Sequence, residues 1–338
     1  MKYVIELSEQ LRGKVADFMR RKGLSSLSDV VHVALENQLE LEAHGEGPVG
    51  GHPVARAEPL PPGSAPPLSS PWADIRVDDL MWKSIQTAQP GSLANAPVWG
   101  QVNRLFPMKV SLRVLARGLA TGKGEMTLQQ FHTDATSICA RARTYLEAYD
   151  AKRNLPRGER LSAAFPENTE KSARRFQAQF LGRVLRDGRV LGALPEFGFV
   201  TISAGHVLMT DQGLGFARLA NPVLDSEEPS AEALSSEEVG FLLDHLRTRM
   251  PEEFAFLTTI LRWISDGSNT PDELTRRVRK AWPQWTAKVA NTMRTGALGR
   301  MHDFGLIARH KKGLRVTYTL SPRGAELVEM LRGERDVR

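Results

Sequence analysis

A chain of 338 residues is longer than a typical single small domain, and it has room for two or three domains. Apolar residues make up 41% of it and charged residues 25%, which is ordinary globular composition and excludes a chain that is disordered throughout. The formal net charge of +6 is compatible with a polyanionic partner. A single cysteine, Cys139, excludes an intramolecular disulfide and predicts a small buried apolar residue. Because no apolar run approaches the ~20 residues that span a bilayer, we expect a cytoplasmic protein without a membrane partner.

The first 44 residues show one strand followed by two helices. Alternating apolar residues from Lys2 to Leu7 predict a half-buried strand. Ser8 is placed to cap a helix that ends at Gly23, and hydroxyl residues at 25–28 precede a second apolar stripe at helical spacing. A lone strand has unpaired backbone groups on both edges, and a segment of this length cannot bury a core of its own. A second copy of the segment would satisfy both needs.

Residues 3–8 together with residues 23–35 resemble the ribbon-helix-helix family. The resemblance implies a homodimer whose paired strands enter the major groove of double-stranded DNA. The outward residues of the strand, Lys2, Val4 and Glu6, would then face base edges, and the second helix would direct its start, near Ser26 and Ser28, at a phosphate. Two alternatives remain open for this module: it only dimerises the chain, or it binds a further protein partner.

Charge and composition divide the rest of the chain. Residues 45–72 are rich in Pro and Gly and have no apolar periodicity, which predicts a flexible linker. Residues 225–253 hold 2 Lys and Arg against 9 Asp and Glu, whereas residues 270–338 hold 15 against 7. The positive charge is therefore concentrated at the carboxyl end.

A basic domain is predicted over residues 226–338. A mostly apolar helix over 254–264 ends at Gly267, a second helix starts at Thr270 with a proline and a capping acid, and a third spans about 286–303. Two strands follow at 306–310 and 314–320, joined by Lys311, Lys312 and Gly313, and a last helix opens at Ser321. We expect three helices, a hairpin and a closing helix.

The run from Gly305 to Gly324, with Leu306, Ile307 and Arg309 in the first strand and Val316, Tyr318 and Leu320 in the second, resembles the end of winged helix-turn-helix domains. That family implies a recognition helix for the major groove and a wing that grips the phosphate backbone. The candidate DNA contacts are Lys288, Arg294 and Arg300 on the third helix and Arg309, Lys311, Lys312 and Arg315 on the hairpin. The alternative is a solvated charged face, but residues 306–320 contain no acid.

Residues 73–225 form the middle domain, which is expected to be helical. A helix over 170–186, strands over 198–203 and 206–210, and a helix from Asp211 again resemble a winged helix, with a short neutral turn. Basic residues of this region could contact DNA or be ordinary surface; they are Arg141, Arg143, Lys152, Arg153, Arg157, Arg160, Lys171, Arg174 and Arg175. Three tryptophans lie just before this domain or in its first residues: Trp72, Trp82 and Trp99. We expect their rings to pack against the domain, and stacking on DNA bases is the alternative.

We find no pattern that predicts catalysis. The eight histidines include no pair spaced four apart and have no cysteine companion, so no metal site is predicted. Gly122 and Gly124 lie in a poor match to a phosphate-binding loop and are expected to end a helix, and acids such as Glu238 and Glu253 are expected at helix starts. We expect no cofactor and no enzyme activity.

The expected fold is mainly α with small β elements: a ribbon-helix-helix module and two winged-helix-like domains. The expected function is that of a dimeric, sequence-specific DNA-binding protein of bacterial type, a transcriptional regulator associated with the nucleoid. The alternative is an accessory or architectural DNA-binding subunit of a plasmid-maintenance or antiphage-defence system.

Overall fold

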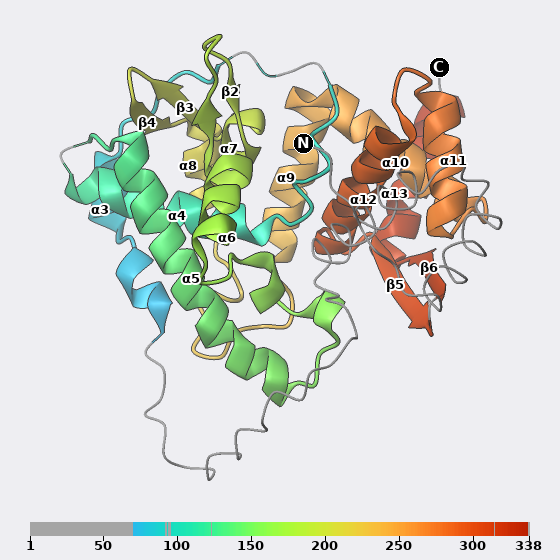
Figure 1. Ribbon diagram of the computed structural model, residues 1–338, viewed down its shortest axis with the longest axis horizontal. Helices are drawn as coiled ribbons and strands as arrows, with labels where there is room; N and C mark the ends of the chain where they lie inside the picture. Colours follow the sequence, from blue (N-terminus) through green and yellow to red (C-terminus); the bar gives the residue numbers. More distant parts are fainter. Residues whose placement is uncertain (1–69, 92, 94–95, 123, 314, 337–338) are drawn as a thin grey trace, which may run out of the picture. The chain divides into compact units, whose positions relative to one another are not determined.

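The computed structural model describes residues 70–336, apart from positions 92, 94–95, 123 and 314. Of these, residues 70–154 and 160–336 belong to one compact unit, which does not include the single-turn helix Arg157–Glu159. Helices predominate and all strands are short, which confirms the mainly α class with small β elements (Figure 1). The predicted strand and helices of residues 1–44, with Lys2, Val4, Glu6, Ser26 and Ser28, lie outside the described residues, as do residues 45–69 of the linker predicted over 45–72. The last two residues of that predicted linker, Pro71 and Trp72, are buried in a short helix.

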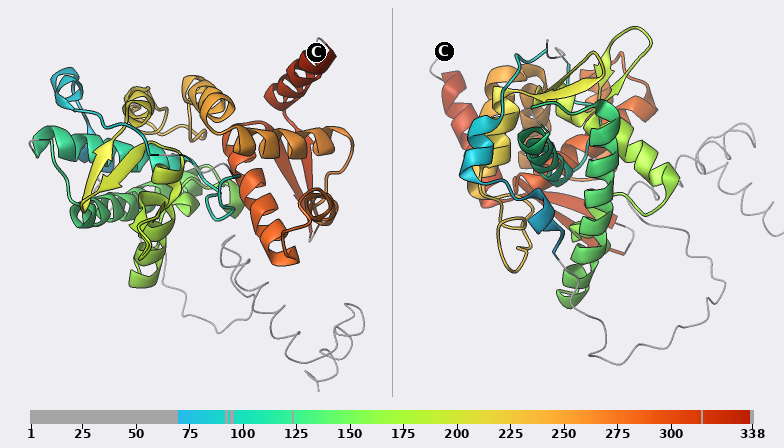
Figure 2. Two further views of the ribbon diagram at one scale, coloured as in Figure 1. Left: turned by 90° about the horizontal axis from the view of Figure 1, so that it is seen from above. Right: turned by 90° about the vertical axis from the view of Figure 1, so that its left-hand side faces the viewer.

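The first half of the unit is built around two long helices, α4 and α5. Helix α4 is buried along most of its length and is seen end-on amid the surrounding elements in the right-hand view of Figure 2. The elements in chain order are η1 (Pro71–Ile75), α3 (Asp79–Ser84), α4 (Phe106–Thr121), α5 (Leu128–Lys152), η3 (Ser162–Ala164), α6 (Glu170–Phe176), η4 (Gln177–Leu181), β1 (Arg183–Val184), β2 (Val190–Leu191), α7 (Ala193–Glu196), β3 (Val200–Ser203), β4 (His206–Met209) and α8 (Asp211–Arg218).

From the helix Pro251–Ser265 onward the second half follows the predicted order of helices, hairpin and closing helix, whereas the range of the helix before it, Ser236–Arg249, was not predicted. Its elements are α9 (Ser236–Arg249), α10 (Pro251–Ser265), α11 (Pro271–Ala281), α12 (Ala287–Asp303), β5 (Ile307–Lys312), β6 (Arg315–Leu320) and α13 (Pro322–Asp336). Helix α13 lies at the periphery of this group in both views of Figure 2.

Local signals in the sequence account for most helix boundaries. Thr270 accepts a hydrogen bond from the Glu273 backbone while the Glu273 carboxylate accepts from the Thr270 backbone, so α11 starts with the predicted capping box. Gly267 and Gly305, both with positive φ, follow α10 and α12 as predicted, and Gly122 follows α4.

One helix is shorter than predicted. The expected helix over 170–186 ends at Leu181, because Gly182 has a φ of 119° that leaves the helical region. Arg183 and Val184 then form β1, which pairs with β2 in a hairpin that the sequence analysis did not predict.

In each half, the backbone of a hairpin strand contacts the short segment that precedes an earlier helix. Thr127, just before α5, bridges His206 of β4, and the Val207 backbone donates to Met126. In the second half the backbone of Tyr318, in β6, donates to the carbonyl of Asn269, just before α11, over 2.9 Å. Each half therefore has the order helix, short extended segment, helix or helices, hairpin, helix.

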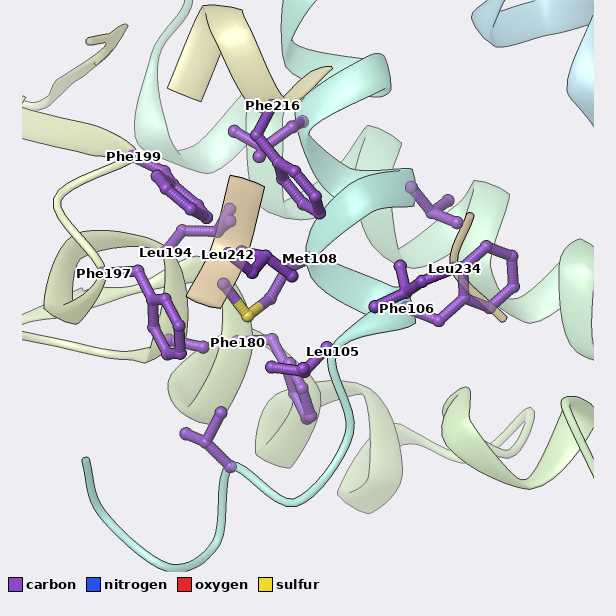
Figure 3. Close-up of a cluster of buried hydrophobic side chains, with 14 of the residues drawn as sticks. Leu105, Phe106, Met108, Phe180, Leu194, Phe197, Phe199, Phe216, Leu234 and Leu242 are labelled. Atoms are coloured by element: carbon purple, nitrogen blue, oxygen red, sulfur yellow. The ribbon is translucent and has the colours of Figure 1, made fainter. Parts of the chain in front are cut away.

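Buried apolar side chains from both halves form one continuous cluster. Figure 3 shows part of it, with Met108 of α4 near Leu242 of α9 and Phe106 pointing to the other side of α4, near Leu234. The predicted domain boundary at 225/226 stays a prediction, although α9 contributes to the core that surrounds α4.

Candidate nucleic-acid interface

The β5–β6 hairpin presents a dense group of cations. Its register pairs Arg309 with Tyr318 and Lys312 with Arg315, and the side chains of Ile307 and Tyr318 at its base are buried. Figure 1 shows the hairpin tip pointing away from the helices. Five basic side chains toward the tip are exposed: Arg309, His310, Lys311, Lys312 and Arg315.

Both faces of the outer hairpin are positively charged, because successive residues of a strand point to opposite sides. Arg309 and Lys311 lie on one face, and Lys312 and Arg315 share the other. Strand β5 runs two residues further than expected, so Lys311 and Lys312 lie in the strand rather than in the turn. No acid occurs between residues 306 and 320 to offset these charges.

The three candidate residues of α12 lie in different environments. Lys288 is exposed at the amino-terminal end of the helix. Arg294 is 7% exposed, and its guanidinium donates to Asn291 one turn earlier. Arg300 is 0% exposed. The expectation that Arg300 contacts DNA is therefore corrected, and Arg294 has little surface to offer, since both side chains are enclosed by the rest of the unit.

Arg300 forms a buried ion pair with Glu253 of α10. Its Nε donates to a Glu253 carboxylate oxygen over 2.8 Å, and its terminal nitrogens donate to the carbonyls of Val98 and Val102. The second carboxylate oxygen accepts from the Val98 backbone over 2.8 Å. Burial raises the pKa of the Glu253 carboxyl, and the neighbouring guanidinium opposes that shift. This pair fixes residues 98–102 against α10 and α12.

Residues 98–105, the covering segment, pack directly onto α12. A Cβ placed on Gly296 would lie 2.3 Å from the Gly100 carbonyl oxygen, and one on Gly299 would lie 2.4 Å from that of Asn103. Asp303, the last residue of α12, accepts from the Leu105 backbone over 2.7 Å. Within α12 only Ala287 and Lys288 are exposed. The face that a recognition helix would present to the major groove is thus largely covered by the same chain.

Helix α11 carries exposed cations that the sequence analysis did not single out: Arg276, Arg277, Arg279 and Lys280. Two apolar side chains, Leu274 and Val278, are buried and fix the opposite face of the helix. The spacing of these two residues is the signal that would have placed the four cations outside.

Several cations of the first half are offset by acids. Arg141 pairs with Asp74 over 2.5 Å and Lys152 with Glu228 over 3.7 Å. Arg143 contacts Glu147 and Glu167, and Arg174 pairs with Glu170. These contacts favour the interpretation as ordinary surface for this region.

The tryptophans named in the sequence analysis divide into two groups. Trp72 and Trp82 are 5% and 7% exposed, as expected for rings that anchor a segment. Trp99 is 43% exposed, so the packing prediction does not describe it fully. Its backbone amide donates to the carboxylate of Glu196, which adds a further contact between the covering segment and the rest of the unit.

Within the described part of the chain, no group of three or more His, Cys, Asp and Glu residues is placed to hold a metal ion. Cys139 is buried and has a free thiol, as predicted. No helix among the described residues has both the length and the apolar character needed to cross a bilayer.

Comparison of the chain with protein-family models, with curated proteins and with solved structures found no match.

Proposed function

We propose that this protein binds double-stranded DNA and that the β5–β6 hairpin grips the phosphate backbone. The observation that carries the proposal is the hairpin itself, with exposed Arg309, Lys312 and Arg315 and no acid from residue 306 to residue 320. A duplex carries a dense row of negative charges, and each cation that approaches a phosphate releases condensed counterions. A solvated surface usually mixes both signs of charge, as the first half of this unit does.

The order of elements supports the proposal. Helices α10, α11 and α12, a hairpin, and the backbone bond from Tyr318 to Asn269 match the arrangement of a winged helix-turn-helix, in which the hairpin is the wing. A wing contacts phosphate or the minor groove and needs positive charge near its tip. No catalytic chemistry, metal or cofactor is part of the proposal.

Sequence readout is assigned to the amino-terminal module. Phosphate contacts position a protein but carry no sequence information, and α12 is largely covered. We therefore assign base contacts to Lys2, Val4 and Glu6 of a dimeric ribbon, with the helix start near Ser26 and Ser28 on a phosphate. With this division of contacts, the function that we propose is that of a dimeric, sequence-specific regulator of transcription.

A second candidate function is favoured by the covered face of α12. If the ribbon only dimerises the chain, the remaining contacts are those of the hairpin with the backbone, as in an accessory or architectural DNA-binding subunit. Footprinting separates the two functions, because a regulator protects one defined site and an architectural subunit protects DNA of any sequence.

The salt dependence of DNA binding tests the proposal. In the hairpin variant Arg309, Lys312 and Arg315 are replaced by Gln in the full-length protein. Binding of a labelled duplex is measured between about 50 and 200 mM salt. The slope of log K against log salt is negative, and each lost phosphate contact makes it less steep by about 0.9. We expect the hairpin variant to have a slope shallower by up to about 2.7 for one bound hairpin and by up to about 5.4 for a dimer that binds with both hairpins.

The matched control removes the same charge elsewhere. Lys171, Arg174 and Arg175 are exposed on α6, and their replacement by Gln gives the α6 control variant with an equal change of charge. This variant is expected to keep the wild-type slope. If the hairpin variant also keeps it, or if the wild-type protein does not bind the duplex, the proposed function is wrong.

The ribbon is tested by its own deletion. Removing residues 1–44 is expected to convert a dimer to a monomer in light scattering, because the deletion removes the strand that is proposed to pair with its copy in the second protomer. A dimer that persists would move the interface to the described unit. Replacing Lys2 and Glu6 by Ala is expected to relax base preference at symmetric positions while the dimer remains.

A further inference from the structure

A shallow depression lies beside α11, on the side opposite to its buried residues. Its volume is about 360 Å³, and it is lined by Ser268, Glu273, Arg276, Arg277 and Lys280. We call it the α11 cleft. Ser268 belongs to the turn after α10, and the other four residues recur at helical spacing along one side of α11.

The cleft has an excess of positive charge. Its three cations are exposed, and no carboxylate in the described part of the chain forms an ion pair within 4.0 Å of Arg276, Arg277 or Lys280. The single acid, Glu273, accepts from the hydroxyl of Thr270 over 2.8 Å and from its backbone over 3.2 Å. These bonds lower the pKa of Glu273 and turn its carboxylate toward the helix start, and the nearby charge of Arg276 lowers that pKa further by a smaller amount. The cations therefore remain available to an external anion.

Aromatic contacts hold part of the cleft in place. The guanidinium of Arg277 lies over the ring of Trp263, 5.8 Å from its centre. Trp263 in turn packs edge-on against Trp282, with 6.2 Å between ring centres. An arginine held over an aromatic ring loses less side-chain freedom on binding, and its outer N–H groups stay directed at solvent.

From this geometry we infer that the α11 cleft binds a phosphodiester group of the same DNA that the hairpin grips. Phosphate oxygens accept hydrogen bonds from guanidinium, ammonium and hydroxyl groups, and the α11 cleft has all three. The inference rests on the proposed function and adds a second phosphate contact to it. A small phosphorylated ligand is the competing occupant, but such ligands bind in sites that enclose most of their surface, whereas this depression is shallow.

The test uses the full-length protein with Arg276, Arg277 and Lys280 replaced by Gln, which we call the α11 variant. All three side chains are exposed, so the fold is expected to persist, and a thermal melt by circular dichroism checks this. The slope of log K against log salt is measured for the wild-type protein, the α11 variant, the hairpin variant and the α6 control variant. We expect the α11 variant to have a slope shallower by up to about 2.7 for each protomer that contacts the DNA, with the slope of the control unchanged.

A second measurement distinguishes the two sources of phosphate. Inorganic pyrophosphate is titrated into the wild-type protein and the α11 variant in a calorimeter. We expect no saturable binding by either protein at low millimolar concentration. Pyrophosphate binding that only the variant loses, with an unchanged salt slope, would overturn the inference in favour of a free phosphorylated ligand.

Failure of the inference differs from failure of the proposed function. If the salt slope of the α11 variant equals that of the wild type while that of the hairpin variant is shallower, the α11 cleft does not bind the DNA. DNA binding by the hairpin then remains supported. Salt slopes that become shallower by the same amount in the α11 variant and the α6 control variant would show an effect of total charge and would also overturn the inference. Absence of DNA binding by the wild-type protein would remove both proposals.

Discussion

The replacement of Arg300 by Met is the sharpest test of the buried network between α12 and the covering segment. Methionine keeps much of the length of the side chain but removes every donor. Glu253 then keeps its bond from the Val98 backbone and loses the guanidinium, while the carbonyls of Val98 and Val102 lose their donor. The variant thus leaves a buried carboxylate without its cation.

The expected magnitude follows from that unpaired charge. Both side chains of the pair are 0% exposed, so water does not replace the lost partner. Removing one member of a buried ion pair typically costs about 3–5 kcal/mol of unfolding free energy. Replacing Arg300 by Met together with Glu253 by Gln is expected to cost less than the sum of the two single changes, because no isolated charge is then buried.

Urea unfolding followed by far-ultraviolet circular dichroism measures these free energies. Arg309, exposed on the hairpin, is the matched control, and its replacement by Met is expected to change the unfolding free energy by no more than about 0.5 kcal/mol. The salt slope of DNA binding is measured on the same proteins under conditions where they are folded. We expect the Arg309 variant alone to have a shallower slope.

The opposite pattern would refute the reasoning. An Arg300 variant that is as stable as the wild type but has a shallower salt slope would show that Arg300 faces DNA, as the sequence indicated. The covering segment would then not occupy α12 in solution, and base readout by this helix would again be possible.

Three further predictions follow from buried groups. Gly296→Ala is expected to destabilise the protein by about 1–3 kcal/mol, because the new methyl would lie 2.3 Å from a backbone oxygen of the covering segment. The control Gly240→Ala, on α9 and with open space around it, should stabilise the protein by up to about 1 kcal/mol. Equal effects of the two changes in urea unfolding would contradict the close contact. Burial lowers the pKa of Lys109, which pairs with Glu238, to about 8. Between pH 8 and pH 10.5 the unfolded chain therefore holds a proton that the folded chain lacks, so the unfolding free energy of the wild type should rise with pH relative to that of Lys109→Met. Parallel pH profiles of the two proteins would argue against a buried lysine. Burial also raises the pKa of the Cys139 thiol, so a thiol reagent should modify Cys139 only after unfolding, and fast labelling of the native protein would contradict its burial.

Local chemistry made much of the second half predictable. The cap at Thr270, the proline after it and the positive-φ glycines at 267 and 305 fix where helices start and end, since each satisfies or ends a local set of backbone bonds. The hairpin and its exposed cations were also predicted, because alternating residues and a glycine turn are features of a few neighbouring residues. Its strand β5 ran only two residues further than expected.

Only the tertiary structure decided which cations are available. In the sequence, Arg300 is one more basic residue of a helix, and Glu253 is an acid in the first turn of another helix, favourable to its dipole. Their pairing joins residues 47 apart, and the bond from Val98 to Glu253 joins residues 155 apart, so no local period signals either contact. Glycine inside a helix is unfavourable in itself, yet the missing side chains of Gly296 and Gly299 admit the covering segment. Periodicity shows which face of a helix is apolar, but the covering of a polar face depends on a distant segment, and that distance is why the burial of Arg300 could not be predicted.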